Sequence, residues 1–150
     1  MSETECVKVL IADDESHIRM LMKRVIKKCG FDIAGEARDG QEAVDLFRKT
    51  LPDLLLLDIN MPRKTGIEAL EEIRSVYPNA CVIMLTSVSD FDNVKKCIGL
   101  GAVNYLRKDT PLEEIEELVK KTCEKLEKGK ELKENAGDKP DTDDKGEIND

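Results

Sequence analysis

Aromatic residues are scarce in this sequence. They make up 3% of its 150 residues, and tryptophan is absent. We therefore expect a core built from aliphatic side chains. The single histidine, His17, has no partner residues at metal-ligand spacing, so we interpret it as a surface residue.

The sequence also lacks long apolar runs and paired cysteines. No apolar segment approaches the roughly 20 residues that a membrane-spanning helix needs, and the N-terminal MSETECVK has neither the basic nor the apolar region of a secretory signal. No CxxC pattern occurs among the five cysteines, Cys6, Cys29, Cys81, Cys97 and Cys123. These absences argue against a membrane protein, a disulfide framework and a zinc site, and they predict a cytoplasmic protein with reduced thiols.

Positive charge is in deficit. Lysine and arginine number 24 against 32 for aspartate and glutamate, which gives a formal net charge of −8. A negative chain repels the phosphates of nucleic acids and of anionic lipids. We therefore expect neither nucleic acid nor a membrane as a direct partner.

Length and local composition predict one domain followed by a tail. A chain of 150 residues suffices for one domain with a substantial core. From residue 128 the sequence reads KGKELKENAGDKPDTDDKGEIND, in which Gly, Pro, Asn and Asp are frequent and large apolar residues are few. We expect a folded domain over residues 1–127 and an acidic, disordered tail over 128–150.

The folded part alternates apolar runs with amphipathic stretches. The apolar runs predict strands at 7–12, 31–37, 53–57, 80–85 and 103–106. The amphipathic stretches predict helices near 15–29, 40–50, 66–77, 90–100 and 111–127. Capping-box patterns precede every helix except the first, which follows Asp13, Asp14 and Glu15. We expect those opening carboxylates to be engaged elsewhere.

This alternation predicts a parallel sheet covered by helices on both faces. The run DLLLLD suits a central strand that is buried on both sides. Right-handed crossovers then give a doubly wound sandwich, which binds ligands beyond the carboxyl ends of its strands at the topological switch point. In the five-stranded order 2-1-3-4-5, that point lies between strands 1 and 3.

Crowded carboxylates mark this predicted switch point. Asp13 and Asp14 follow the first strand, and Asp58 follows the third. Two carboxylates about 4 Å apart repel by roughly 4 kcal/mol at an effective dielectric constant near 20, so a cation would offset a substantial cost. Oxygen ligands suit Mg²⁺.

A hydroxyl and an ammonium are predicted at the same edge of the sheet, because Thr86 and Lys108 follow the fourth and fifth strands. Together with the three aspartates, these two side chains are suited to handling a phosphoryl group on one carboxylate.

Four segments in a characteristic order and spacing carry a resemblance to a known family. They are LIADDES, LLLLDINMP with Gly66, MLTS, and GAVNYLRK. Over residues 6–127 the chain resembles the receiver domain of two-component response regulators. The resemblance implies a flavodoxin-like doubly wound (βα)5 sandwich that works as a phosphorylation-activated switch, similar to stand-alone chemotaxis regulators. It implies a histidine kinase or phosphotransfer protein as phosphoryl donor and a downstream protein as target.

The same resemblance implies roles for the matching residues. Asp58 is implied as the phosphoacceptor, in a domain that catalyses its own phosphorylation and dephosphorylation without being a conventional enzyme. The implied Mg²⁺ ligands are Asp13, acting largely through water, Asp14, Asp58 and the backbone carbonyl of Asn60.

The resemblance also implies how the signal leaves the site. Lys108 is implied to contact the phosphoryl group, while Thr86 and Tyr105 are implied as a coupled switch. The implied readout surface is the fourth helix, the fifth strand and the fifth helix, residues 89–127. One departure concerns the residue after Lys108, which is often a proline in the family and here is Asp109. A cis bond to a residue other than proline costs about 2.5–4 kcal/mol, so we expect this bond to be trans.

Other classes remain as alternatives. The chain is alternatively the receiver part of a longer DNA-binding regulator, or a protein-binding module that needs no phosphorylation. A haloacid dehalogenase-type phosphatase also uses an aspartate nucleophile and Mg²⁺, but it expects a second aspartate where this chain has Asn60. A flavodoxin-like cofactor carrier is disfavoured by the acidic first loop and the absence of tryptophan.

Overall fold

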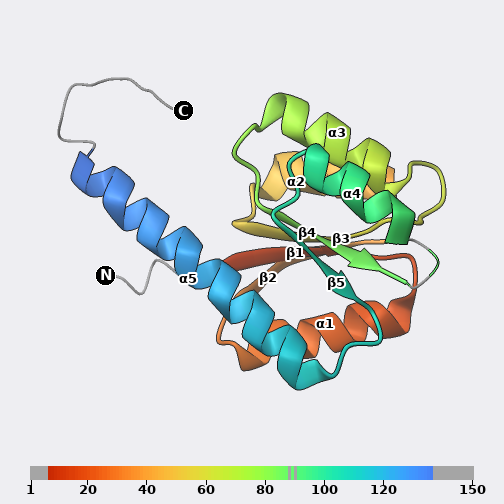
Figure 1. The fold of residues 1–150 in the computed structure, drawn as a ribbon, viewed down its shortest axis with the longest axis horizontal. Helices are drawn as coiled ribbons and strands as arrows, with labels where there is room; N and C mark the ends of the chain where they lie inside the picture. The colour runs from red at the N-terminus through yellow and green to blue at the C-terminus, as the bar shows by residue number, and fades with distance from the viewer. Residues whose placement is uncertain (1–6, 88, 90, 137–150) are drawn as a thin grey trace.

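Strands and helices alternate through the residues that the computed structural model describes, 7–87, 89 and 91–136 (Figure 1). The strands are β1 (Lys8–Ala12), β2 (Asp32–Ala37), β3 (Leu54–Asp58), β4 (Val82–Thr86) and β5 (Asn104–Arg107). The helices are α1 (Ser16–Lys28), α2 (Gly40–Thr50), α3 (Gly66–Val76), α4 (Phe91–Gly99) and α5 (Leu112–Ala136). Each element lies close to its predicted position, apart from the end of α5.

The strands form one parallel sheet in the order β2-β1-β3-β4-β5. This confirms the doubly wound α/β fold and its strand order. β1 and β3 are neighbours, with Ala12 opposite Leu57 at the ends of the two strands. The residues that follow them therefore emerge together at one edge of the sheet, which is the switch point.

Helices cover both faces of the sheet. α2, α3 and α4 lie on one face, and α1 and α5 lie on the other (Figure 1). All residues of β3 are buried because its side chains alternate between two apolar clusters, with Leu55 and Leu57 on the α2 side and Leu54 and Leu56 on the α1 side. Burial on both sides is why this strand is apolar throughout and shows no polar alternation.

Local signals set the helix starts. Thr65 and Glu68 form the predicted capping box at the start of α3. At α2 the Asp39 carboxylate accepts a hydrogen bond from the Glu42 backbone N–H. The residue before α1, Glu15, makes no such side-chain cap, as the missing pattern predicted.

Helix α5 is longer than predicted. The expected end was residue 127, but the helix continues to Ala136 and projects beyond the sheet in Figure 1. Lysine, glutamate and leucine have good helix propensities, and extending an existing helix does not incur the cost of nucleation. The proposed domain boundary at residue 127 stays a prediction, and residues 137–150 of the predicted tail lie outside the described residues.

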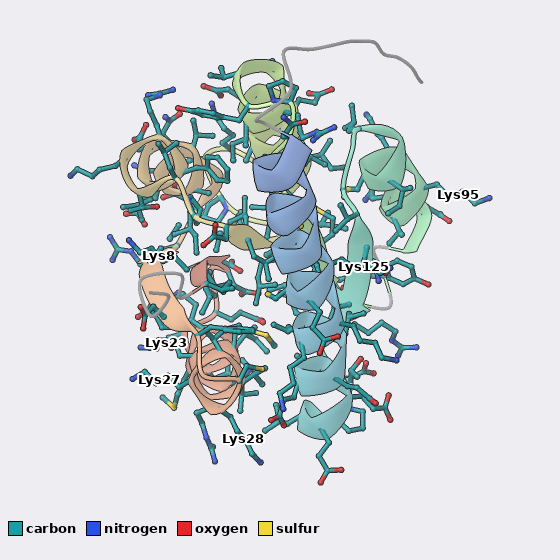
Figure 2. All side chains as sticks on the ribbon, turned by 90° about the vertical axis from the view of Figure 1, so that its left-hand side faces the viewer. Lys8, Lys23, Lys27, Lys28, Lys95 and Lys125 are labelled. Atoms are coloured by element: carbon teal, nitrogen blue, oxygen red, sulfur yellow. The ribbon has the colours of Figure 1, made fainter. Side chains whose placement is uncertain are left out.

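The negative net charge is not spread evenly over the surface. Every charged residue of α1 is basic, and Figure 2 shows Lys23, Lys27 and Lys28 extending outward from this helix. Lys23 pairs with Glu36 on β2 at 2.7 Å, which neutralises part of this charge. Over the part of the chain that the structure describes, no helix combines the length and apolar character needed to cross a membrane.

Four cysteines fall within the described residues, and none of the four forms a disulfide bond. Cys81 and Cys97 are buried, as the apolar faces around them predicted. Burial raises the pKa of the Cys81 thiol to about 11, which keeps it in the unreactive protonated form at neutral pH. These cysteines therefore act as small packing residues. Cys6 lies outside the described residues.

Candidate functional site

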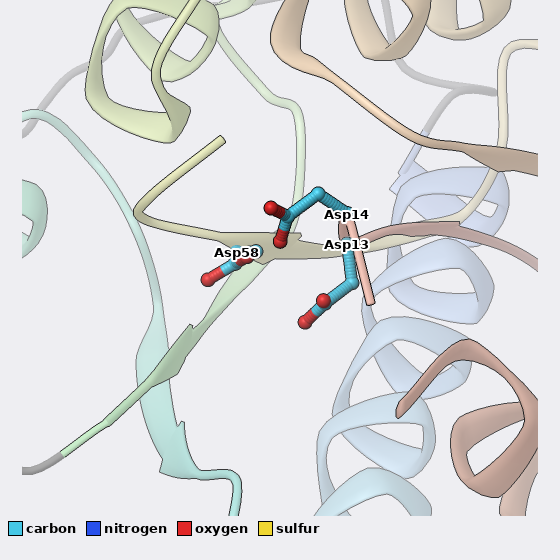
Figure 3. A group of neighbouring side chains, drawn as sticks. All are labelled: Asp13, Asp14 and Asp58. Atoms are coloured by element: carbon cyan, nitrogen blue, oxygen red, sulfur yellow. The ribbon is translucent and has the colours of Figure 1, made fainter. Parts of the chain in front are cut away.

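Three aspartates meet at the edge of the sheet where the switch point was predicted. Asp13 and Asp14 follow β1, and Asp58 is the last residue of β3. Their carboxylates converge in Figure 3, and one oxygen from each lies within 4.8 Å of the other two. They come together because parallel neighbouring strands end at the same edge of a sheet, although the residues are far apart in sequence.

Burial makes this cluster costly to keep charged. Asp13 and Asp58 are 0% and 1% exposed, whereas Asp14 is exposed. Burial and repulsion from Asp13 raise the pKa of Asp58 to about 7. Burial also raises the pKa of Asp13, although a hydrogen bond from the Glu15 backbone N–H and the charge of Lys108 oppose that rise.

Lys108 supplies the positive charge of the site. Its Nζ lies 3.0 Å from Asp13 Oδ2, 3.0 Å from Asp58 Oδ1 and 3.5 Å from a Glu15 carboxylate oxygen. The Lys108 backbone N–H donates to the Thr86 carbonyl, which ties the loop after β5 to β4. Burial alone would lower the pKa of Lys108, but the two aspartates raise it well above its usual range. The lysine is therefore charged at neutral pH.

One ammonium does not satisfy the cluster. Within the described residues, Asp58 Oδ2 is buried and has no hydrogen-bond partner, and Asp13 Oδ2 has only the ion-pair contact with Lys108, without hydrogen-bond geometry. A buried carboxylate oxygen without a donor is costly. The unpartnered oxygen and the excess of carboxylates over ammonium fit a divalent cation bound through oxygen ligands.

The remaining predicted residues lie at different distances from this cluster. Asn60 is exposed in the loop after β3, and its backbone N–H lies 3.4 Å from Asp58 Oδ1. Thr86 is the last residue of β4 and is buried at the same edge of the sheet. Tyr105 lies on β5 opposite Met84 and is 39% exposed, so part of its side chain is in contact with solvent. His17 is exposed, as predicted.

The loop after β5 has ordinary peptide geometry. Among the described residues no peptide bond is cis, so the bond between Lys108 and Asp109 is trans, as predicted. The Arg107 guanidinium makes a bidentate ion pair with the Asp109 carboxylate. Asp109 therefore has its own partner and does not enlarge the acidic cluster.

Sequence reasoning missed several contacts around the site. Arg19 of α1 donates to the Asp13 backbone carbonyl at 2.8 Å and also pairs with Glu36. Arg63 pairs with the Asp39 carboxylate at 2.7 Å. No local pattern marks either arginine, because each contact joins segments that become neighbours only in the folded sheet.

The fold and the acidic edge together define a doubly wound α/β protein with a candidate metal site at its switch point. A family model described as "Response regulator receiver domain" matches residues 9–120. The chain belongs to the response regulator receiver family, and the protein is therefore a receiver domain of two-component signalling.

Characterised relatives include chemotaxis and regulatory proteins. The chain is 39% identical over 101 residues to the chemotaxis protein CheY of Thermotoga maritima, covering 67% of this chain and 84% of that protein. It is 36% identical over 114 residues to sporulation initiation phosphotransferase F of Bacillus subtilis, covering 76% and 91%. It is 42% identical over 108 residues to the transcriptional regulatory protein PdtaR of Mycobacterium tuberculosis, covering 72% of this chain and 52% of that protein.

Solved structures show the same fold. The receiver domain of AraT from Geobacillus stearothermophilus has a TM-score of 0.77 and 34% identity, covering 83% of this chain and 98% of that one. CheY in the CheX-CheY-BeF3-Mg+2 complex from Borrelia burgdorferi is matched with a TM-score of 0.74 and 30% identity, covering 79% and 91%.

Proposed function

We propose that this protein is a phosphorylation-activated switch that accepts a phosphoryl group on Asp58. The observation that carries the proposal is the buried Asp58 carboxylate, which has one oxygen paired with Lys108 at 3.0 Å and the other oxygen without a partner. Among the described residues no hydrogen-bond donor engages the lone pairs of this oxygen, which supports a role as the nucleophile. The donor would be a histidine kinase or phosphotransfer protein, and the site would lie in the cytoplasm.

The chemistry is a direct displacement. An Asp58 oxygen forms the new O–P bond while the bond from phosphorus to the donor's histidine nitrogen breaks, and the electron pair leaves with that nitrogen. The aspartyl phosphate carries roughly 1.5–2 negative charges where the ionised carboxylate carried one, so the negative charge of the site rises by about one at most. Lys108, already 3.0 Å from Asp58, is placed to balance part of that charge, and the buried Thr86 hydroxyl lies at the same edge of the sheet.

A divalent cation fits this scheme. Asp13, Asp14 and Asp58 would hold Mg²⁺, with the Asn60 backbone carbonyl as a further ligand. When bound, Mg²⁺ would offset carboxylate repulsion and the charge of the phosphoryl oxygens. The similar CheY from Borrelia burgdorferi was solved in a complex that contains Mg²⁺ and BeF3. The likeness of the two chains in sequence and fold supports the proposal of a Mg²⁺ site here.

Intact mass spectrometry tests the phosphoacceptor. After incubation with acetyl phosphate and Mg²⁺, we expect one phosphoryl adduct on the parent protein and none on Asp58→Asn, since the amide is a poor nucleophile. The matched control is Asp45→Asn, an exposed aspartate on α2, which should be modified like the parent. An adduct on Asp58→Asn, or no adduct on the parent while a known receiver is modified, would contradict the proposal and favour a binding module that needs no phosphorylation.

The proposed readout surface is α4, β5 and α5, residues 89–127. Thr86 and Tyr105 would connect the site to this surface as a coupled switch. The Lys108 N–H, in the loop after β5, donates to the Thr86 carbonyl, and Tyr105 lies on β5 itself. A protein partner would bind where Ile98, Val103 and Tyr105 expose apolar surface. Phosphorylation would bias the equilibrium between two conformations of this surface.

Amide chemical shifts test this readout. With Mg²⁺ and beryllium trifluoride, we expect shifts in residues 89–127 comparable to those beside Asp58. The exposed side of α2 serves as an internal reference and should change little. Shifts confined to the loops around the carboxylates would show that the signal does not reach this surface.

A further inference from the structure

The loop between β3 and α3, residues 59–65, connects the proposed phosphoacceptor to α3. Its two ends are closed by the Gly66 backbone N–H, which donates to the Ile59 carbonyl at 2.7 Å. Asn60 lies inside this closed loop. The position of its backbone therefore depends on what holds the middle of the loop.

Two contacts hold the middle of the loop against the start of α2. The Gly40 backbone N–H donates to the Lys64 carbonyl at 3.0 Å. The Arg63 guanidinium donates to one oxygen of Asp39, from Nε at 3.0 Å and from the terminal nitrogen at 2.7 Å. The first contact is between backbone groups, so the second is the one that depends on side-chain identity.

Asp39 is a well-anchored partner for Arg63. Its other oxygen caps α2 by accepting the Glu42 backbone N–H at 2.8 Å, and its side chain is only 9% exposed. Two residues before it, the Ala37 carbonyl accepts the Asp13 backbone N–H at 3.0 Å. The turn from Ala37 to Gly40 thus contacts Asp13 on one side and the loop after Asp58 on the other.

Arg63 has an unfavourable backbone conformation that its side-chain contact helps to keep. Its φ is 67°, in the left-handed region, which is unfavourable for a residue other than glycine. A loop residue in such a conformation tends to relax when its contacts are removed. The ion pair with Asp39 offsets this tendency.

We propose that the Arg63–Asp39 ion pair positions the loop after β3 so that Asp58 and Asn60 hold a divalent cation together with Asp13. Arg63 touches neither the carboxylate cluster nor a ligand, so it is a positioning residue. The inference rests on the proposed function, because it assigns the pair a role at the same cation site.

The test compares Mg²⁺ binding by calorimetry in the parent, Arg63→Gln, Asp39→Asn and the double variant. Asparagine keeps the capping oxygen, and the Gly40–Lys64 contact remains in every variant, so all are expected to fold. We expect each single variant to raise the Mg²⁺ Kd about three- to tenfold. This is a smaller loss than is usual when a residue in direct contact with a metal ligand is changed, because Arg63 and Asp39 act through the loop backbone. The double variant should be no weaker than the worse single variant, since both remove one interaction.

Two controls separate positioning from stability. Arg48→Gln removes an exposed ion pair with Asp45 on the same helix and should leave the Kd unchanged. Arg63→Lys should recover part of the affinity, because it restores the charge without the two guanidinium donors that meet at one Asp39 oxygen. A lowered Tm with an unchanged Kd in Arg63→Gln would reduce the pair to a structural contact and overturn the proposal.

A readout without metal keeps this inference separate from the proposed function. In metal-free protein, Arg63→Gln should speed amide exchange at residues 59–66 at least threefold, and Arg48→Gln should not. If the parent binds no Mg²⁺, the proposed function fails and the assigned role fails with it, whatever the exchange shows. If the parent binds Mg²⁺ but exchange and Kd are both unchanged in Arg63→Gln, only the positioning role is overturned.

Discussion

Gly66→Ala is expected to destabilise the domain by about 3 kcal/mol, at the upper end of the usual cost of overpacking. A Cβ at this position would lie 1.8 Å from the Asp58 carbonyl oxygen and 2.9 Å from the Ile59 Cα. Both are backbone atoms, one at the end of β3 and one at the start of the loop that follows it, so neither can swing aside as a side chain would. Relief requires the loop to move away from the start of α3.

Urea denaturation followed by circular dichroism measures this effect. The matched control is Gly99→Ala at the end of α4, where a Cβ would meet nothing within 4 Å. That variant should be neutral or more stable by up to about 1 kcal/mol, because alanine favours helices. If Gly66→Ala differs from the parent by less than about 0.5 kcal/mol, which is the range of ordinary surface changes, the close approach at Asp58 is not the reason for glycine here.

Asp58→Asn is expected to have the opposite effect in metal-free protein, raising the free energy of unfolding by about 2 kcal/mol at pH 8. The pKa of Asp58 is about 7 in the folded protein against 3.8 as the ordinary value. A rise of that size corresponds to at most about 4 kcal/mol of destabilisation once the group is ionised. That figure already includes the attraction of Asp58 to Lys108. Burying the polar amide of asparagine offsets part of the gain, which leaves the smaller figure.

The sign of the pH dependence follows from proton binding. Between pH 4 and pH 7 the folded protein holds a proton on Asp58 that the unfolded chain has released, so the parent loses stability as the pH rises through this range. The advantage of Asp58→Asn should therefore be present at pH 8 and nearly absent at pH 5. An uncharged amide removes the repulsion from Asp13 at every pH.

Urea denaturation at pH 5 and pH 8 in the presence of a chelator measures this difference. Asp45→Asn, which removes an exposed carboxylate, should differ little from the parent at both values. Adding Mg²⁺ at pH 8 should stabilise the parent more than Asp58→Asn, since ligands stabilise the state that binds them. A variant less stable than the parent at pH 8 would mean that the Lys108 contact outweighs the burial and repulsion of the carboxylate.

Much of the fold could be predicted because its signals are local. The buried run of β3, the helical spacing in α1 and the capping residues of α2 and α3 each depend on residues close in sequence. The gathering of Asp13, Asp14 and Asp58 followed from one general rule, since parallel strands end at a common edge. Their roles in metal binding and phosphorylation remain proposals.

Other features could not be predicted from local signals. Some depend on contacts between segments that are distant in sequence, and the end of α5 has no apolar face that would mark it as a helix. The length of α5 was underestimated because the sequence beyond residue 127 has no apolar face, whereas a helix already begun continues on propensity alone. The exposure of Tyr105 depends on its place on the edge strand β5. The implied coupling of Tyr105 to Thr86 remains a proposal.

The sequence by itself determined the alternation of elements, the strand order and the edge at which the acidic residues collect, because hydrophobic periodicity and the handedness of crossovers leave few other arrangements. Only the tertiary structure decided the protonation of the carboxylates and the hydrogen bonds and ion pairs around them. The pKa of Asp58, the unpartnered Asp58 oxygen and the Arg63–Asp39 ion pair all depend on burial and on distances between groups far apart in the chain. Electrostatic energies vary steeply with those two quantities, and neither can be read from the order of the residues.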